Sequence, residues 1–190
     1  GVTTQTNGLN GRLGLSLDRP NGTVTAAAFA DTDQDGTRVN LEFGRNLELP
    51  NGALSATLGL TRPEGGNTDL TGSLFWQHNL PDGALSAQIS RSVETDNTDS
   101  ERLTTLVAVG YDHDINAVSG LGIDISHSVN DGGTGDPAVD NTNLSARYRH
   151  ALTEDWDLSV GLGYRRRKEE GIAAAESQTI FLTLGRSFDF

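Results

Sequence analysis

The chain has 190 residues, no cysteine and a formal net charge of −12. This length suggests one domain, the lack of cysteine excludes a disulfide framework or a thiol nucleophile, and the acidity argues against nucleic acid as a partner. Hydrophobic residues make up only 35% of the sequence, against roughly 45–50% in ordinary globular proteins. That is little for a thick soluble core, but enough for a thin apolar coat around a polar interior.

Eleven segments alternate between apolar and polar residues, and a period of two predicts β-strands with one apolar face. In the fourth segment, for example, Leu54, Leu58 and Leu60 share one face, while Ser55 and Thr57 share the other. No apolar run approaches the roughly 18 residues of a membrane helix, so only a β-barrel could carry this chain through a bilayer. The segments are 8–19, 23–32, 37–49, 53–63, 68–80, 84–95, 102–115, 120–130, 142–152, 156–168 and 177–190.

The connections alternate in length. Pro-Asn-Gly at 20–22 and 50–52, and Pro-Asp-Gly at 81–83, predict tight hairpin turns, and two looser short turns follow near 116–120 and 153–155. Longer, acidic, glycine-rich connections are expected between them, at 31–36, 62–68, 94–101, 130–141 and 168–177. This alternation is typical of an up-and-down outer-membrane barrel with short periplasmic turns. A soluble β-sandwich binding ligands through its acidic loops would show the same strand pattern and is the alternative fold.

The last eight residues resemble the C-terminal β-signal of Gram-negative outer-membrane β-barrels, in which a polar residue and a glycine precede aromatic-x-aromatic. The matching positions are Thr183, Gly185, Phe188 and Phe190. The resemblance implies an antiparallel transmembrane β-barrel in the bacterial outer membrane. It also implies contact with the barrel-assembly machinery and with outer-membrane lipid or lipopolysaccharide.

Strand direction raises the question of closure. If Phe190 lies on the periplasmic side, the segment 8–19 runs downward, although bacterial barrels generally have even strand numbers. We therefore expect a barrel of twelve-strand size. Its twelfth strand would be absent, squeezed into residues 1–7, or supplied by a removed upstream part or by another chain. The 190 residues are accordingly expected to form a single barrel domain, the C-terminal part of a longer polypeptide.

Large aromatic residues fall on the apolar face, several near strand ends where the aromatic girdles of membrane barrels lie. Three arginines share that outward parity, Arg45, Arg91 and Arg186. An arginine at the lipid midplane costs roughly 2–4 kcal/mol, so these residues should lie near a rim or be turned inward by a bulge.

Two histidine-centred tripeptides, Asp112-His113-Asp114 and Ser126-His127-Ser128, invite comparison with barrel hydrolases. Adjacent strand residues point to opposite faces, so neither tripeptide can form a nucleophile–base pair within its own strand. We predict that the protein is not an enzyme and that both histidines are solvated or interfacial.

The sequence Asp31-Thr-Asp33-Gln-Asp35-Gly36 resembles the start of a calcium loop. The glutamate of the twelfth position and the flanking helices are both missing. An acidic hairpin loop is the favoured interpretation, and a weakly held divalent cation on the external loops is the one cofactor considered.

Charges on the polar face carry the functional prediction. A basic wall of the pore lining is expected from Arg12, Arg147, Arg149 and Arg165, and an acidic wall elsewhere around the ring from Glu42, Asp112 and Asp124. In a solvated lumen, separated walls create a transverse field that filters polar solutes. In a narrow lumen the same charges would interlock as a salt-bridge plug. The predicted function is a narrow pore for small polar solutes or ions, and the alternative is a plugged anchor or translocator barrel for an upstream domain or partner chain.

Overall fold

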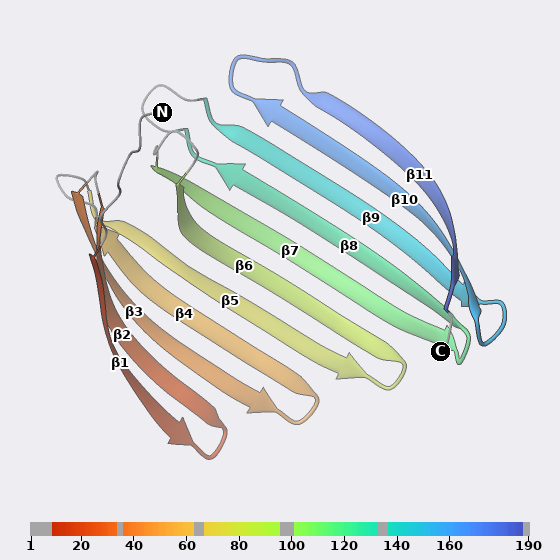
Figure 1. Ribbon diagram of the computed structural model, residues 1–190, viewed down its shortest axis with the longest axis horizontal. Coiled ribbons are helices and arrows are strands. Elements are labelled where there is room, and N and C mark those ends of the chain that lie inside the picture. Colours follow the sequence, from red (N-terminus) through yellow and green to blue (C-terminus); the bar gives the residue numbers. More distant parts are fainter. Residues whose placement is uncertain (1–8, 34–35, 63–66, 96–100, 133–136, 188–190) are drawn as a thin grey trace, which may run out of the picture.

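The computed structural model describes residues 9–33, 36–62, 67–95, 101–132 and 137–187. They form one antiparallel sheet of eleven strands, in which every strand pairs with its neighbours in sequence, from β1 to β11 (Figure 1). The all-β, up-and-down architecture is therefore confirmed. The strands are β1 (Leu9–Arg19), β2 (Gly22–Asp33), β3 (Gly36–Leu49), β4 (Gly52–Arg62), β5 (Asp69–Leu80), β6 (Gly83–Thr95), β7 (Glu101–Asn116), β8 (Ser119–Asn130), β9 (Val139–Ala151), β10 (Trp156–Glu169) and β11 (Ala175–Arg186). The described part of the chain contains no helix with the length and hydrophobicity that a bilayer crossing requires.

The predicted strand ends agree with the structure to within two residues, except at the start of β9 and the end of β11. The longer connection expected over 31–36 is wrong, because β2 and β3 continue pairing until only residues 34 and 35 join them. Thr32 pairs with Thr37, and their hydroxyls lie 3.1 Å apart. Strand β9 begins three residues earlier than expected. Strand β11 ends at Arg186 rather than continuing to the end of the chain, and residues 188–190 lie outside the described residues.

The two faces of the sheet differ in polarity. Its large apolar side chains are exposed, whereas a soluble domain would bury them. Large apolar side chains cover the convex face and are exposed there, for example Leu58 at 65% and Leu162 at 56%. Among the described residues, Val139 is the one hydrophobic side chain that counts as buried. All described strands belong to one sheet, so no second sheet covers this face and the sandwich alternative finds no support.

The short turns are tied to the neighbouring hairpins. The carbonyl of Asn51 accepts a hydrogen bond from the Asn79 amide (2.7 Å), and that of Asp82 accepts one from the Asp114 amide (2.8 Å). The glycine that follows each Pro-x pair sits beside a backbone carbonyl of the next descending strand. Gly83 has a φ of 152°, and a Cβ there would collide with the Asp112 carbonyl oxygen. Glycine is needed at this position because both the backbone angle and the close approach exclude a side chain.

We expect Gly83→Ala to lower the free energy of unfolding by about 1–3 kcal/mol, through a strained φ and a displaced hairpin ladder. Urea titration of the protein refolded into lipid vesicles measures this loss. The matched control is Gly163→Ala, since a Cβ at Gly163 meets its nearest neighbour at 3.8 Å. Equal stability of the two variants would contradict the proposed role of the turn glycine.

Candidate functional site: the charged concave face

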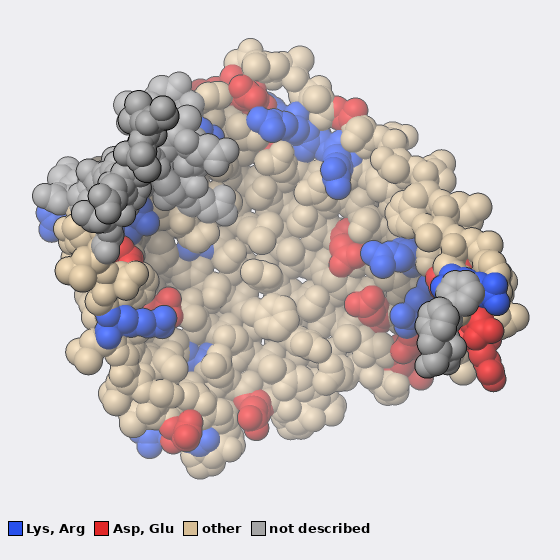
Figure 2. All heavy atoms as spheres, viewed as in Figure 1, with Lys and Arg blue, Asp and Glu red and all other residues tan. Residues whose placement is uncertain are grey.

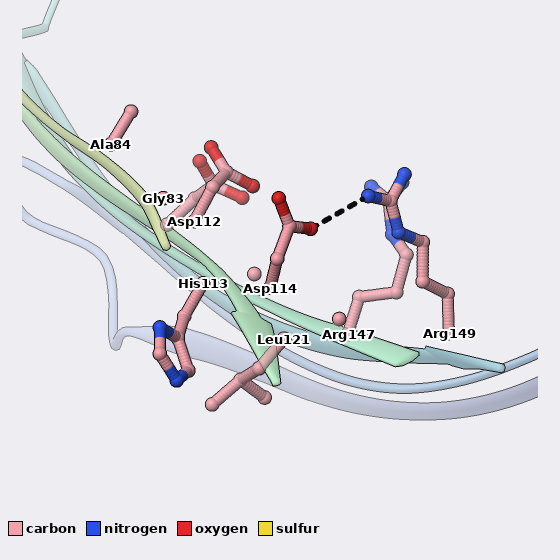
Figure 3. A pocket seen from close by; sticks show the side chains of 11 residues that line it. Gly83, Ala84, Asp112, His113, Asp114, Leu121, Arg147 and Arg149 are labelled. Atoms are coloured by element: carbon pink, nitrogen blue, oxygen red, sulfur yellow. Dashed lines mark hydrogen bonds and ion pairs between the residues drawn. The ribbon is translucent and has the colours of Figure 1, made fainter. Parts of the chain in front are cut away.

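Charged side chains gather on the hollowed face of the sheet, over the right-hand strands in the view of Figure 2. A cavity of about 480 Å³ lies there between β7, β8 and β9. Its charged lining comes from Asp112 and Asp114 of β7, Asp124 of β8, and Arg147 and Arg149 of β9. In Figure 3, Asp112, Asp114, Arg147 and Arg149 rise from one side of the sheet, and His113 and Leu121 leave from the other.

Glycine in β8 lets acid and base approach each other. Gly120 pairs with Asp114 on one side and with Arg149 on the other. A Cβ at Gly120 would lie 3.0 Å from Arg149 Nε and 3.4 Å from Asp114 Oδ1. The missing side chain leaves room for the ion pair between Arg149 Nη2 and Asp114 Oδ1, at 3.2 Å. We call this arrangement an acid–glycine–base rung.

A second rung lies one step further along the strands. Gly122 pairs with both Asp112 and Arg147, and a Cβ at Gly122 would lie 3.2 Å from Asp112 Oδ1. Neither Asp112 nor Arg147 forms an ion pair with another residue of the described segments. The second rung therefore juxtaposes opposite charges without joining them.

The charges of this cavity are open to solvent. In the Arg149–Asp114 pair the side chains are 70% and 63% exposed, and an exposed pair typically contributes about 0–1 kcal/mol. Asp124 accepts a hydrogen bond from the Ser145 hydroxyl at 3.4 Å. Within the described residues the cavity therefore contains one loose ion pair, which is far from an interlocked plug.

The predicted separation of acidic and basic walls is wrong here. Asp112 and Asp124 line the same cavity as Arg147 and Arg149, because consecutive strands of a meander are neighbours. Both the inward orientation of these side chains and the order of their strands could be read from the sequence. Asp114, which was not among the predicted lining residues, makes the ion pair.

Two of the other predicted lining residues, Arg165 and Glu42, lie in further hollows of the same face. Arg165 lines a cavity of about 660 Å³ with Thr179 and Phe181. Glu42 lines one of about 350 Å³ with Arg38 and Phe29. The guanidinium of Arg12 lies 5.8 Å from the centre of the Phe29 ring. Whether these residues line a conducting pore stays a prediction.

Phenylalanine on the polar face was not anticipated. Phe29 and Phe181 both line hollows of that face. The ring of Phe181 occupies the space where a Cβ of its partner Gly161 would stand. The glycine opposite an aromatic residue is the sequence signal for this packing, because a glycine in a strand leaves backbone that a ring can cover.

As expected from strand alternation, the histidines of the two tripeptides make their contacts elsewhere than with the adjacent acids and serines. His113 Nδ1 lies 2.9 Å from the Asp82 carbonyl oxygen, and His127 Nδ1 lies 3.0 Å from Thr142 Oγ1. A serine–histidine contact that the sequence analysis missed joins Ser119 Oγ to His150 Nδ1 at 2.7 Å. Ser119 is only 6% exposed, so its hydroxyl is poorly placed for attack on a substrate.

The predicted calcium loop lies largely outside the described residues. Asp31 lines the hollow that contains Glu42, whereas the side chain of Asp33 and the whole of Asp35 lie outside. No group of three potential metal ligands among histidine, aspartate and glutamate occurs in the described segments. Of the residues in the predicted C-terminal signal, Thr183 and Gly185 belong to β11, while Phe188 and Phe190 lie outside the described residues.

No protein-family model and no curated protein matches this sequence. Among solved structures, the chain is similar to the NanC porin in a rhombohedral crystal form, with a TM-score of 0.44 and 11% identity. That alignment covers 96% of this chain and 98% of the porin. It is also similar to a chain from a study of the in-meso crystallization of membrane proteins, with a TM-score of 0.37 and 11% identity over 98% of this chain and 79% of the other.

Proposed function

We propose that this chain is a non-enzymatic transmembrane β-barrel of the bacterial outer membrane, and that it forms a narrow pore for small polar solutes or ions. One observation carries the proposal: the convex face is apolar and exposed, and the concave face is polar and charged. Apolar surface exposed to water costs roughly 25 cal/mol per Å². A face on which leucine, valine and isoleucine predominate is stable when lipid surrounds it.

The solvated charges of the concave face support conduction. Mixed acidic and basic groups that stay hydrated can bind an ion or a zwitterion weakly and release it, as passage through a pore requires. The two acid–glycine–base rungs would place this filter near the short-turn end of the lumen. In the proposed orientation that end is periplasmic.

We expect the refolded protein to show steady single-channel steps in a planar bilayer. Arg147→Glu/Arg149→Glu should move the reversal potential in a salt gradient toward cation selectivity, because the double change replaces two positive lumen charges with negative ones. Arg147→Lys/Arg149→Lys keeps both charges and is the matched control, with selectivity near that of the unchanged protein. Absence of channels in a protein that migrates as a folded, heat-modifiable barrel would contradict the pore.

The edges of the sheet favour a second candidate, a barrel that anchors or translocates another polypeptide segment. No contact joins β1 to β11 within the described residues. Leu13 of β1 is 78% exposed and Leu182 of β11 is 70% exposed, against 43% for Val109 in the middle of the sheet. The edge side chains are more exposed because each lacks one neighbouring strand.

Strand direction indicates what would fill this seam. In an antiparallel series β1 and β11 run the same way, so joining them directly requires a parallel pair. One additional strand running the opposite way would continue the antiparallel pattern on both edges and give the even number typical of bacterial barrels. We propose that an upstream part of the same polypeptide or a partner chain supplies this strand.

Because these 190 residues contain no cysteine, pairs of introduced cysteines can test the seam in membranes of cells that express the protein. Leu13→Cys/Leu182→Cys should resist disulfide formation and yet be joined by a thiol crosslinker with a span of about 10 Å, the width of two strand spacings. Val160→Cys/Leu182→Cys is the control, because these residues are direct partners in β10 and β11 and should oxidise readily. Rapid disulfide formation across the seam would show direct closure and exclude an inserted strand.

A further inference from the structure

Three strands that descend toward the short turns repeat one pattern on the convex face. Each carries an aromatic residue and, two positions later, a histidine whose ring stacks on it. The pairs are Trp76–His78 on β5, Tyr111–His113 on β7 and Tyr148–His150 on β9. Their ring centroids are 5.8, 6.0 and 6.4 Å apart, and their interplanar angles are 8°, 10° and 9°.

The strand register places these pairs at one level. Following the pairing across β6, His78 is opposite Tyr111, two residues before His113. Following it across β8, His113 is opposite Tyr148, two residues before His150. A constant shift of two residues per hairpin is the stagger that accompanies strand tilt in a barrel, so the three histidines share one height near the short turns.

The next descending strand continues the series with a permanent charge. The same shift of two leads from His150 across β10 to Arg186 of β11. The guanidinium of Arg186 lies 5.2 Å from the centre of the Trp156 ring. We call His78, His113, His150 and Arg186 the histidine belt.

Backbone and hydroxyl contacts fix the orientation of two belt rings. His113 Nδ1 donates to the Asp82 carbonyl at 2.9 Å, and this leaves Nε2 with no hydrogen-bond partner among the described residues. His150 Nδ1 lies 2.7 Å from Ser119 Oγ, which also accepts a hydrogen bond from the Tyr148 hydroxyl at 3.2 Å. All three histidines are half-buried, so one side of each ring still faces outward.

The charges around the belt leave a place for an anion. Its neighbours on β6, β8 and β10 are apolar, namely Leu85, Leu121 and Leu158. Carboxylates in or beside the short turns include those of Asp18, Glu48, Asp82, Glu154 and Asp155, and Arg19 and Arg45 are further cations with outward parity. Within the described residues, none of these carboxylates forms an ion pair with a belt histidine.

We propose that the histidine belt binds the phosphate groups of anionic phospholipids at the short-turn rim, and binds them more strongly as pH falls. The inference rests on the proposed membrane-spanning function. Aromatic residues of membrane barrels lie at the headgroup level, where a phosphodiester is within reach. Histidine changes charge between about pH 5 and 8, and its protonated ring has two N–H donors for charge-assisted hydrogen bonds to phosphate.

The tryptophans provide a built-in reporter. The chain has two, Trp76 and Trp156, and each lies against a belt residue. In vesicles of phosphatidylcholine and phosphatidylglycerol, one lipid at a time is brominated so that it quenches tryptophan fluorescence on contact. Lowering the pH from 8 to 5 should raise the preference for phosphatidylglycerol about two- to fivefold, since a basic residue near an anionic surface is worth on the order of 1 kcal/mol.

Variants separate the belt from the membrane as a whole. His78→Gln/His113→Gln/His150→Gln should remove the pH response and keep heat-modifiable migration. Trp156→Phe, which leaves the reporter beside His78, should show a larger pH response than Trp76→Phe. A pH response that persists in the triple variant, or its absence in the unchanged protein, would overturn the belt proposal. If neither brominated lipid quenched at any pH, the membrane-spanning function itself would fail.

Discussion

Backbone hydrogen bonding is the constraint on which the rest of this structure depends. In hydrocarbon each unpaired N–H or C=O costs several kcal/mol, so a membrane sheet must pair its strands and close. From β1 to β11 the ladders meet this demand, and the short turns extend it, because Asn51 and Asp82 bond to the neighbouring hairpins. Glycine is needed after each Pro-x pair because the turn lies so close to the next hairpin that a side chain would not fit. The same constraint makes the seam between β1 and β11 significant, because it is the one place in the described sheet where ladders end.

Once the strands are paired, their side chains alternate between the two faces, and this alternation sets the chemistry of each face. The convex face is mainly apolar, although Arg45 and Arg91 share its parity. At the short-turn rim, stacked aromatic and histidine rings and Arg186 replace the leucines. The concave face combines acids, bases and glycines. In β8, Gly120 sets how closely Asp114 and Arg149 approach, so a residue without a side chain shapes the charge pattern of the concave face. In the proposed pore, the lipid-facing and solute-facing properties would thus come from neighbouring residues of the same strands.

Much of this architecture could be predicted from the sequence, because a period of two is a strong signal when each strand has one lipid-like face. The strands around the Pro-x-Gly turns agree with the prediction to within a residue or two. The connection at 34–35 was mispredicted because its acidic, glycine-containing composition suggests a loop, although cross-strand pairing persists through Thr32 and Thr37. Composition does not show how far a ladder extends.

The site was predicted less well, for a different physical reason. The alternation of residues along each strand identified the charges that point inward. The ion pair of Arg149 with Asp114, however, depends on the register of β7 and β9 across β8. The contact between Ser119 and His150 likewise depends on register, because the two residues are direct partners across β8 and β9. The aromatic-x-histidine pairs are visible in the sequence, whereas their common level follows only from the shift of two residues per hairpin.

The most direct test of the central claim, that the convex face lies in lipid, is a spin-label accessibility scan along β4 in vesicles. Single cysteines replace each residue from Leu54 to Thr61, and collisions with oxygen and with a water-soluble nickel chelate are measured. The account predicts a period of two, with oxygen favoured at Leu54, Leu58 and Leu60 and the nickel chelate at Ser55 and Thr57. Protection of the leucine positions from both reagents would place that face against protein instead of lipid and would contradict the account.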